Sequence, residues 1–425
     1  MEFLTVETLE TSRGKLLNNA EGWLVSEEIV TLDESLGRTA ARDIFTEEDI
    51  PAFRRSTVDG YAILSEDTSA ADESIPVFLS LKGRIDMGLP ANITLKNGEC
   101  AEVPTGGMIP EGSTAVVMVE YTEELGTDTI AVGQSAAYGE NVVLPGEDAK
   151  AGDVLVKRGR CILPQDIGAL AAAGVSNVLV YTSPKVTVIS TGDELVSLET
   201  GATTETTEEK SKRKSKQKIL EPGKIRDSNS HALAALARKH GFTVTETAVL
   251  PDDENLLEST VLAAIKTSSI VMVSGGSSKG KKDLTKIVFD RIAKVHTHGI
   301  ALQPGKPTIL GFDQGSQTIL VGLPGHPVSA MMVFEQLLGW LHRKVTGSPK
   351  PLAIPARLSC NTASSPGRLT CHPCRLTLTD EGYVAEPILG KSGLITTLTQ
   401  AKGYFVCLRD VEGFKEGQMV MVHLF

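Results

Sequence analysis

The stretch VSGGSSKGKKD, residues 273–283, follows the apolar run IVM and comes close to a nucleotide-binding signature. Gly275, Gly280 and Lys281 satisfy the pattern G-x-x-x-x-G-K, but Lys282 stands where a P-loop places the Ser or Thr whose hydroxyl binds magnesium. The stretch therefore has three interpretations: an altered ATP site, a plain surface turn, or a phosphate-binding loop of another kind.

Strands and helices alternate on both sides of this loop. Candidate strands cover residues 185–190, 242–249, 269–273 and 317–321, and candidate helices cover 228–240, 254–266, 284–293 and 327–345. Alternation of this kind predicts a doubly wound, mostly parallel sheet. Ligands of such sheets bind beyond the carboxyl ends of the strands. The segments TGDE (191–194), PDDE (251–254) and GLPGHP (322–327) follow three strands, and the opening stretch follows another, so we expect a site at this edge.

Two features of this edge favour an anion. The loop 274–280 offers backbone N–H groups in a glycine-rich turn, which binds phosphate in many proteins. A tight turn that needs glycine for its geometry explains the same residues. Pro327 suits the first position of a helix, whose free N–H groups attract negative charge. His326 either contacts the ligand or only caps this turn, and Lys306, in the turn QPGKP, either binds an oxyanion or lies free on the surface.

Acidic residues at the same edge allow a metal. Asp227, Ser228 and Asn229 are all good helix-capping residues, which is one explanation of the segment. The other is that Asp227 joins Glu194 and Asp283 at the cleft. Three carboxylates beside a phosphate need an intervening cation, and oxygen ligands shared with phosphate suit Mg²⁺.

The composition narrows the function classes. The chain has 425 residues and a formal net charge of −11, which disfavours nucleic acid as a partner. The N-terminus lacks a signal-peptide pattern, and no apolar run reaches the roughly 18 residues of a membrane span, so we expect no membrane partner. Six cysteines are too few for a disulfide scaffold of this length, which favours a cytoplasmic protein.

The remaining segments predict further units. We expect helices at 4–19, 35–45 and 164–173, β-prone runs between 61 and 130, and short strands at 353–358, 382–386, 404–408 and 419–424 that form a small barrel or sandwich. The polar insert 200–218, with its basic cluster 210–216, is interpreted as a mobile loop or solvated linker. The motif Cys371-His372-Pro373-Cys374 lies among β-prone residues, which disfavours a redox or zinc role.

The motifs together resemble one family. They are RRSTVDGYAI (54–63), PTGGMIPEGSTAVVMVE (104–120), ISTGDEL (189–195), GKIRDSN (223–229), the opening stretch, PGKP (304–307) and GLPGHPVSA (322–330). Their order and content are similar to those of the molybdopterin molybdotransferases, the MoeA-type proteins related to the C-terminal domain of gephyrin.

The resemblance implies a multidomain α/β protein with four units. These are an N-terminal linker and dimer domain (1–53 and 141–183), an inserted β module (54–140), a MogA-like α/β domain (184–346) and a C-terminal β barrel (347–425). It also implies a homodimer, with other cofactor-pathway proteins of the molybdopterin adenylyltransferase type as possible partners. The implied reaction inserts molybdenum from molybdate into adenylylated molybdopterin with Mg²⁺-dependent release of AMP.

Site residues carry over from the resemblance by position. The catalytic and metal-binding residues are Glu194, Asp227 and Asp283. The substrate-binding residues are Asp59, Thr105, Thr191, Gly192, Ser228, Asn229, Ser274, Gly275, Gly276, Ser278, Gly280, Pro304, Lys306, Pro307, Pro324, Gly325, His326, Pro327 and Ser329. Among these, Asp59 and Thr105 are expected to face the α/β domain of the partner subunit.

The chain departs from the family pattern at several positions. His326 replaces the usual Asn, and in the C-terminal motif Cys371 and Pro373 replace an aromatic residue and an arginine, with Arg375 as a candidate replacement charge. The alternatives to a molybdotransferase are a tungstate-inserting homologue, a non-catalytic molybdopterin-binding scaffold, and a metallophosphohydrolase of other nucleotides.

Overall fold

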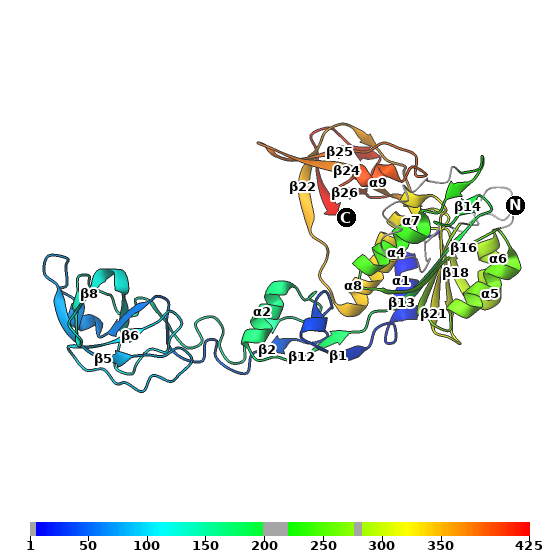
Figure 1. The fold of residues 1–425 in the computed structure, drawn as a ribbon. Helices are drawn as coiled ribbons and strands as arrows, with labels where there is room; N and C mark the ends of the chain where they lie inside the picture. Colours follow the sequence, from blue (N-terminus) through cyan, green and yellow to red (C-terminus); the bar gives the residue numbers. More distant parts are fainter. Residues whose placement is uncertain (1–5, 199–219, 276–282) are drawn as a thin grey trace, which may run out of the picture.

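The computed structural model describes residues 6–198, 220–275 and 283–425. The insert predicted at 200–218 and the loop residues Gly276, Ser278 and Gly280 lie outside the described residues. The chain forms an elongated molecule, with a β module at one end, an α/β unit and a barrel at the other, and a narrow linker unit between them (Figure 1). Within the described part, no helix is both long and apolar enough to cross a membrane.

The predicted α/β sheet is confirmed. It has the strand order β16-β13-β17-β21-β20-β18. The first four strands are mutually parallel, β20 pairs antiparallel with β21, and β18 pairs antiparallel with β20. Side chains of alternating residues enter the two different cores on its faces. The strands are β13 (Lys185–Thr191), β16 (Thr243–Leu250), β17 (Ile270–Gly275), β18 (Lys294–His298), β20 (Ile309–Asp313) and β21 (Thr318–Leu323).

Helices cover both faces of this sheet, as expected for a doubly wound unit (Figure 1). One core buries residues of α5 (Glu254–Ala264) and α6 (Leu284–Ile292). The opposite core buries residues of α4 (Asn229–Lys239), α7 (Pro327–Phe334) and α8 (Trp340–Thr346). The helix predicted at 327–345 is interrupted by a π-helical turn, Glu335–Gly339, between α7 and α8.

The first helix, α1 (Leu9–Ala20), packs on the α/β unit rather than within the linker unit. Its apolar side chains Leu9, Leu16 and Ala20 are buried in the same core as α4, α7 and α8. The expected assignment of all of residues 1–53 to the linker domain is therefore wrong for this helix. Sequence periodicity identifies an apolar helix face but not the surface against which that face packs.

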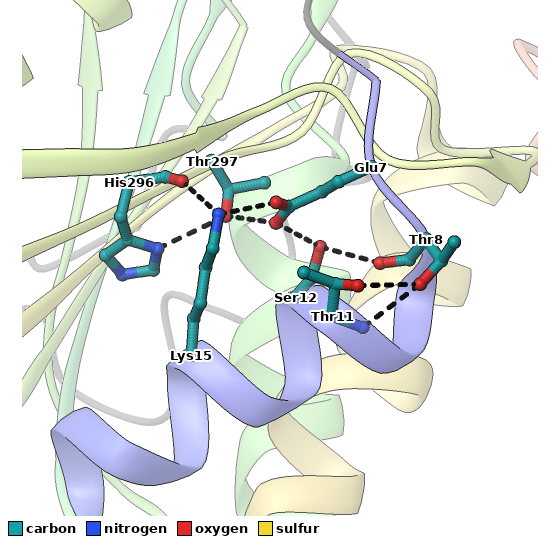
Figure 2. A network of polar contacts seen from close by, with 7 residues as sticks. All are labelled: Glu7, Thr8, Thr11, Ser12, Lys15, His296 and Thr297. Carbon is teal, nitrogen blue, oxygen red and sulfur yellow. Dashed lines mark hydrogen bonds and ion pairs between the residues drawn. The ribbon is translucent and has the colours of Figure 1, made fainter.

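A polar network fixes the start of α1 to the edge of the sheet (Figure 2). The carboxylate of Glu7 accepts hydrogen bonds from Ser12 Oγ at 2.7 Å and Thr297 Oγ1 at 2.5 Å, and pairs with Lys15 Nζ at 2.5 Å. Lys15 Nζ also donates to the carbonyl of His296 at 2.7 Å. Thr8 caps the helix by accepting from Thr11 N, so α1 begins at Leu9 and not at residue 4.

The linker unit is built from paired short strands and one helix. The helix predicted at 35–45 is wrong: a 3-10 turn (Asp33–Ser35) is followed by Gly37 with φ 74°, which stops the helix. Ala40 and Ala41 then donate backbone hydrogen bonds to the returning chain, at Arg160 and Leu179. The elements are β1 (Glu27–Thr31), β2 (Ile44–Phe45), β3 (Arg55–Ser56), β10 (Val142–Val143), β11 (Val154–Val156), α2 (Pro164–Ala172) and β12 (Asn177–Tyr181).

The two outer units are both β structures. The inserted module is a six-stranded sheet with the order β7-β4-β6-β5-β9-β8, formed by β4 (Gly60–Ile63), β5 (Val77–Arg84), β6 (Glu99–Val103), β7 (Ala115–Met118), β8 (Thr122–Leu125) and β9 (Thr129–Val132). The C-terminal sheet closes on itself because β24 pairs with both β25 and β26. The expected barrel consists of β22 (Ala353–Leu358), β24 (Leu369–Thr379), β25 (Gly382–Pro387), β26 (Gly403–Cys407) and β28 (Met419–Leu424).

The α1 network makes the stability of the protein depend on pH. Burial, followed by the positive charge of Lys15, lowers the pKa of His296 to about 4. Between pH 6.5 and about 4 the unfolded chain therefore binds more protons at this site, so stability is lost as the pH falls through this window. We predict that His296→Gln makes the free energy of unfolding less dependent on pH there, as measured by urea titration. An unchanged pH dependence would contradict the prediction.

Candidate functional site

Strands β13 and β17 end side by side, at Thr191 and Gly275. A Cβ atom on Gly275 would lie 2.2 Å from the carbonyl oxygen of Thr191, and Gly275 has φ 123°. Close approach and backbone conformation thus both require glycine at this position. The Oγ1 atom of Thr191 is buried at the same place and has no hydrogen-bond partner among the described residues, which is unusual for a buried polar atom and leaves it available to a ligand.

Asn229 connects three of the strand-end loops. Its Nδ2 atom donates to Ser274 Oγ at 2.8 Å, after β17, and to the carbonyl of Gly325 at 2.8 Å, after β21. Ser274 Oγ in turn donates to the carbonyl of Pro324 at 3.3 Å. The expected convergence of these loops at one edge of the sheet is confirmed, and one amide side chain at the start of α4 fixes their spacing.

Asp227 is the capping residue of α4. It is 2% exposed, and its Oδ1 atom accepts hydrogen bonds from Ser190 Oγ at 2.9 Å, Asn229 N at 3.1 Å and Ser230 N at 3.3 Å, while Oδ2 accepts from Ser230 Oγ. Ser228, at the N-cap position, makes no side-chain cap bond. The carboxylate therefore has few free lone pairs, and of the two explanations of this segment the structure supports helix capping.

A cavity of about 570 Å³ opens above these loops. Glu194 lines it, is exposed, and makes no hydrogen bond or ion pair with any other described residue through its carboxylate. Gly192 lies directly beneath that carboxylate, since a Cβ on Gly192 would come within 2.8 Å of both its oxygens. We name this cavity the strand-end pocket. The residues along the wall of the cavity include Thr191, Gly192, Glu194, Asp227, Ser228, Asn229, Ser274, Gly275, Gly325, His326 and Pro327.

Asp283 does not line this pocket, although the next residue, Leu284, does. Asp283 caps α6 by accepting from Lys286 N at 3.2 Å, and lies 3.8 Å from His298. Burial raises the pKa of Asp283, although the bond from Lys286 N opposes this shift. Among residues 6–198, 220–275 and 283–425, no three His, Cys, Asp or Glu side chains converge on a possible metal position. Glu194, Asp227 and Asp283 therefore do not form the predicted three-carboxylate metal site.

A single carboxylate does fit a magnesium ion that arrives with its substrate. Mg²⁺ usually keeps several waters and is bound by one or two carboxylates together with substrate phosphates. Glu194 projects into the strand-end pocket with its oxygens unengaged by the described residues, whereas Asp227 is committed to α4. Of the predicted ligands, Glu194 is thus the residue that fits this role.

A second cavity of about 530 Å³ lies between the α/β unit and the barrel. Its wall carries the cations Lys306, Arg368 and Lys391 and contains no described Asp or Glu. None of the three cations forms an ion pair with a described residue. We name it the interdomain pocket. Of the predicted site residues it contains Pro304, Lys306, Pro307, Pro324, His326 and Ser329. An acid-free pocket with three cations suits an oxyanion.

His326 lines both pockets and therefore stands at their junction. Its Nδ1 atom lies 2.8 Å from Ser392 Oγ of the barrel, and the carbonyl of Ser392 accepts from Val328 N at 3.2 Å. The N-terminus of α7, predicted to present free N–H groups, is thus partly capped by the barrel. The two pockets thus adjoin at His326; the strand-end pocket carries three carboxylates and Arg226, and the interdomain pocket carries cations without a described carboxylate.

Sequence reasoning did not foresee Lys391 and Ser392. The segment GKSG (390–393) is recognisable as a loop from its glycines, but nothing in the sequence shows that it packs on α7. The candidate Arg375 does not line the interdomain pocket; it lines a neighbouring cavity of about 750 Å³, whose wall shares Ile388 and Thr397 with that pocket. It lies on the exposed surface of the barrel, where it pairs with Glu386 at 3.0 Å and contacts Gln400.

The C-x-x-C motif lies within β24, and its two thiols enter different cores. Cys371 packs with residues of the α/β unit, whereas Cys374 packs inside the barrel. Residues three apart in a strand face opposite sides of the sheet. The two sulfur atoms therefore cannot act as a pair in this fold.

Asp59 and Thr105 lie together in the β module, and neither lines the strand-end pocket or the interdomain pocket of the same chain. Figure 1 shows this module at the opposite end of the molecule from the α/β unit and the barrel. Asp59 Oδ1 accepts from Thr105 N at 2.7 Å and from Thr105 Oγ1 at 3.0 Å. The hydrogen bond from Thr105 N, followed by that from its hydroxyl, lowers the pKa of Asp59. Within one chain these residues cannot contact a ligand in either pocket.

The different roles of Asp227 and Glu194 predict different effects on stability. We expect Asp227→Asn to lower the free energy of unfolding by about 2 kcal/mol, because it weakens a buried cap network. Glu194→Gln, the matched control, should change it by less than about 0.5 kcal/mol because the side chain is exposed. Urea denaturation measures both, and equal effects would contradict the assignment of Asp227 to helix capping.

Comparison with known proteins agrees with this architecture. Models of three sequence families match in chain order: the MoeA N-terminal region (domain I and II) over residues 7–174, the probable molybdopterin binding domain over 187–343, and the MoeA C-terminal region (domain IV) over 355–425. A molybdopterin molybdenumtransferase of Haemophilus influenzae is 30% identical over 423 residues, which is 98% of each chain.

Two further proteins extend the agreement. A putative molybdopterin biosynthesis protein of Methanocaldococcus jannaschii is 31% identical over 93% of this chain and 91% of its own. The crystal structure of a molybdopterin biosynthesis MoeA protein from Pyrococcus horikoshii superimposes with a TM-score of 0.79 at 30% identity, over 99% of this chain and 100% of its own. From the ordered matches, the shared fold and this near-complete coverage, the chain belongs to the MoeA family of molybdopterin biosynthesis proteins.

Proposed function

We propose that this chain is a molybdopterin molybdotransferase, which inserts molybdenum from molybdate into adenylylated molybdopterin and releases AMP with Mg²⁺. The observation that carries the proposal is the junction of two unlike pockets at His326. A phosphorylated pterin and a free oxyanion are both anions, so each needs its own cations or hydrogen-bond donors, and their two sites must adjoin if they are to react. Relatives named molybdopterin molybdenumtransferase, at 30% and 33% identity over more than nine-tenths of this chain, support the same reaction.

The strand-end pocket provides for the phosphorylated substrate. Thr191 Oγ1, which no described residue engages, is available as a donor to a phosphate oxygen. Glu194 would hold Mg²⁺ jointly with the phosphate oxygens, and the bound ion would neutralise the charge that develops on the phosphate as AMP leaves. The protein's own part is to orient the phosphate against the pocket floor.

The interdomain pocket provides for molybdate. Lys306, Arg368 and Lys391 supply positive charge without a competing carboxylate, and Ser329 supplies a hydroxyl. The same chemistry suits tungstate, since both are tetrahedral dianions of similar recognition chemistry. An oxyanion held there would lie next to a pterin in the strand-end pocket, because both ligands would touch His326.

We further propose a homodimer that acts in the cytoplasm, in contact with proteins that supply the adenylylated substrate. The linker unit exposes apolar side chains that a second copy would cover: Ile29 is 71% exposed, Leu36 54% and Phe45 49%. In such a dimer Asp59 and Thr105 would reach the strand-end pocket of the partner chain.

Reconstitution tests the reaction. With adenylylated molybdopterin and Mg²⁺, we expect molybdenum insertion from molybdate, and at least a 100-fold loss in Glu194→Gln because the ion loses its protein ligand. Removing Mg²⁺ with a chelator should have a comparable effect. Insertion from tungstate alone would identify the tungstate homologue. Unchanged turnover in Glu194→Gln would refute the role of Glu194, and absent turnover in a folded wild-type chain would favour a binding scaffold.

Mixing two inactive variants tests the shared site. We expect Asp59→Ala and Glu194→Gln homodimers each to be impaired. Refolding them together would give heterodimers with one intact site, and hence recovery of about a quarter of wild-type activity by random pairing. Two preparations of the same variant, mixed in the same way, are the control. No recovery in a verified heterodimer would show that Asp59 does not act across subunits.

A further inference from the structure

A buried hydrogen-bonded chain joins three distant parts of the sequence at the base of the barrel. Arg13, on α1, donates from Nε to the carbonyl of Gln336 at 2.8 Å and from NH2 to its Oε1 at 2.9 Å. Gln336 Nε2 donates to the hydroxyl of Tyr404, on β26, at 3.0 Å. Gln336 and Tyr404 are 7% and 8% exposed. We call this chain the Arg13–Gln336–Tyr404 node.

The π-helical turn makes the node possible. Gln336 is the second residue of this turn, where the wider helical register opens the regular ladder of carbonyl bonds. The guanidinium of Arg13 donates hydrogen bonds to both the carbonyl and the side-chain amide oxygen of Gln336. The same guanidinium lies over the ring of Trp340, 5.1 Å from the ring centroid. Every polar atom of the Gln336 amide is thus used, so the node is a satisfied buried network that holds one geometry.

Barrel side chains that include Cys371, Tyr404 and Val406 pack against the apolar core of the α/β unit. Polar attachments lie at the rim of the interdomain pocket: on one side β19 (Leu302–Gln303) pairs with β24, and on the other side Ser392 contacts His326 and Val328. Because apolar contacts have no directional preference, the directional hydrogen bonds of the node contribute to the orientation of the barrel. Gln336 is ten residues beyond His326 along the helix, which is roughly 15 Å by helical rise. The node therefore contacts the barrel at a point distant from this rim.

We propose that Gln336 and Tyr404 are positioning residues, which set the angle between barrel and α/β unit and so the width of the interdomain pocket. The proposal rests on the proposed function in assigning molybdate to this pocket. Lys306 lies on one wall, and Arg368 and Lys391 lie on the other, barrel wall. Their separation, and hence their joint hold on a small dianion, depends on that angle. The strand-end pocket lies mainly within the α/β unit and depends on it far less.

Cysteine alkylation tests the hinge independently of activity. Cys371 is buried between barrel and α/β unit, whereas Cys374 is buried inside the barrel. We expect Gln336→Met, and to a lesser degree Tyr404→Phe, to raise the iodoacetamide labelling rate of Cys371 about fivefold and to leave that of Cys374 unchanged. Mass spectrometry distinguishes the two sites. Unfolding would expose both, so equal acceleration, or none, overturns the proposal.

Kinetics test the link to the pocket. For the same variants we expect the KM for molybdate to rise about fivefold, while kcat at saturating molybdate and the KM for adenylylated molybdopterin stay unchanged. The control is Thr318→Val, which removes another fully buried hydroxyl, bonded to Ser268 O at 3.2 Å within the α/β unit. It should alter neither labelling nor KM. Faster Cys371 labelling with an unchanged KM for molybdate would overturn the positioning role.

The outcome is separable from failure of the proposed function. If the wild-type chain inserts no molybdenum, the proposed reaction fails, but selective labelling of Cys371 still reports whether the node holds the barrel. Direct titration of molybdate into the wild type and Gln336→Met by calorimetry then replaces the KM, with the same fivefold weakening expected.

Discussion

The site depends on the close parallel pairing of β13 and β17, which ends with Thr191 opposite Gly275. No side chain fits between these two backbones, because a Cβ at position 275 would collide with the carbonyl of Thr191. Asn229 then fixes the loops after β17 and β21 to the start of α4. The strand-end pocket forms at the ends of β13 and β17, where Gly275 has no side chain and its backbone therefore lines the pocket.

The two pockets differ in charge. Three carboxylates and Arg226 line the strand-end pocket, whereas the interdomain pocket carries three cations and no described Asp or Glu. His326 lines both pockets, and its bond to Ser392 makes their junction part of the interdomain contact. Under the proposed function both ligands are anions, and two adjoining pockets give each of them its own cations or hydrogen-bond donors.

Local patterns predicted well those features that depend on neighbours in sequence. The alternation of strand and helix patterns predicted the α/β unit. Helix capping was one of the two interpretations of Asp227, and the structure shows Asp227 capping α4. Predictions failed where distant segments decide. The segment 35–45 is not helical because residues 39–40 and 44–45 pair with the returning chain. The π turn between α7 and α8 is bonded by Arg13, more than three hundred residues away in the sequence.

The sequence by itself determined the family, the order of the units and most of the strand-end pocket, because short-range motifs encode turns, caps and glycine contacts. Only the tertiary structure decided that Asp283 is absent from the wall of the strand-end pocket, that Arg375 is absent from that of the interdomain pocket, and that α1 belongs to the α/β core. The physical reason is the same in each instance. Which side chains meet depends on how whole units pack, and packing surfaces are apolar faces that fit many partners until the complete chain selects one.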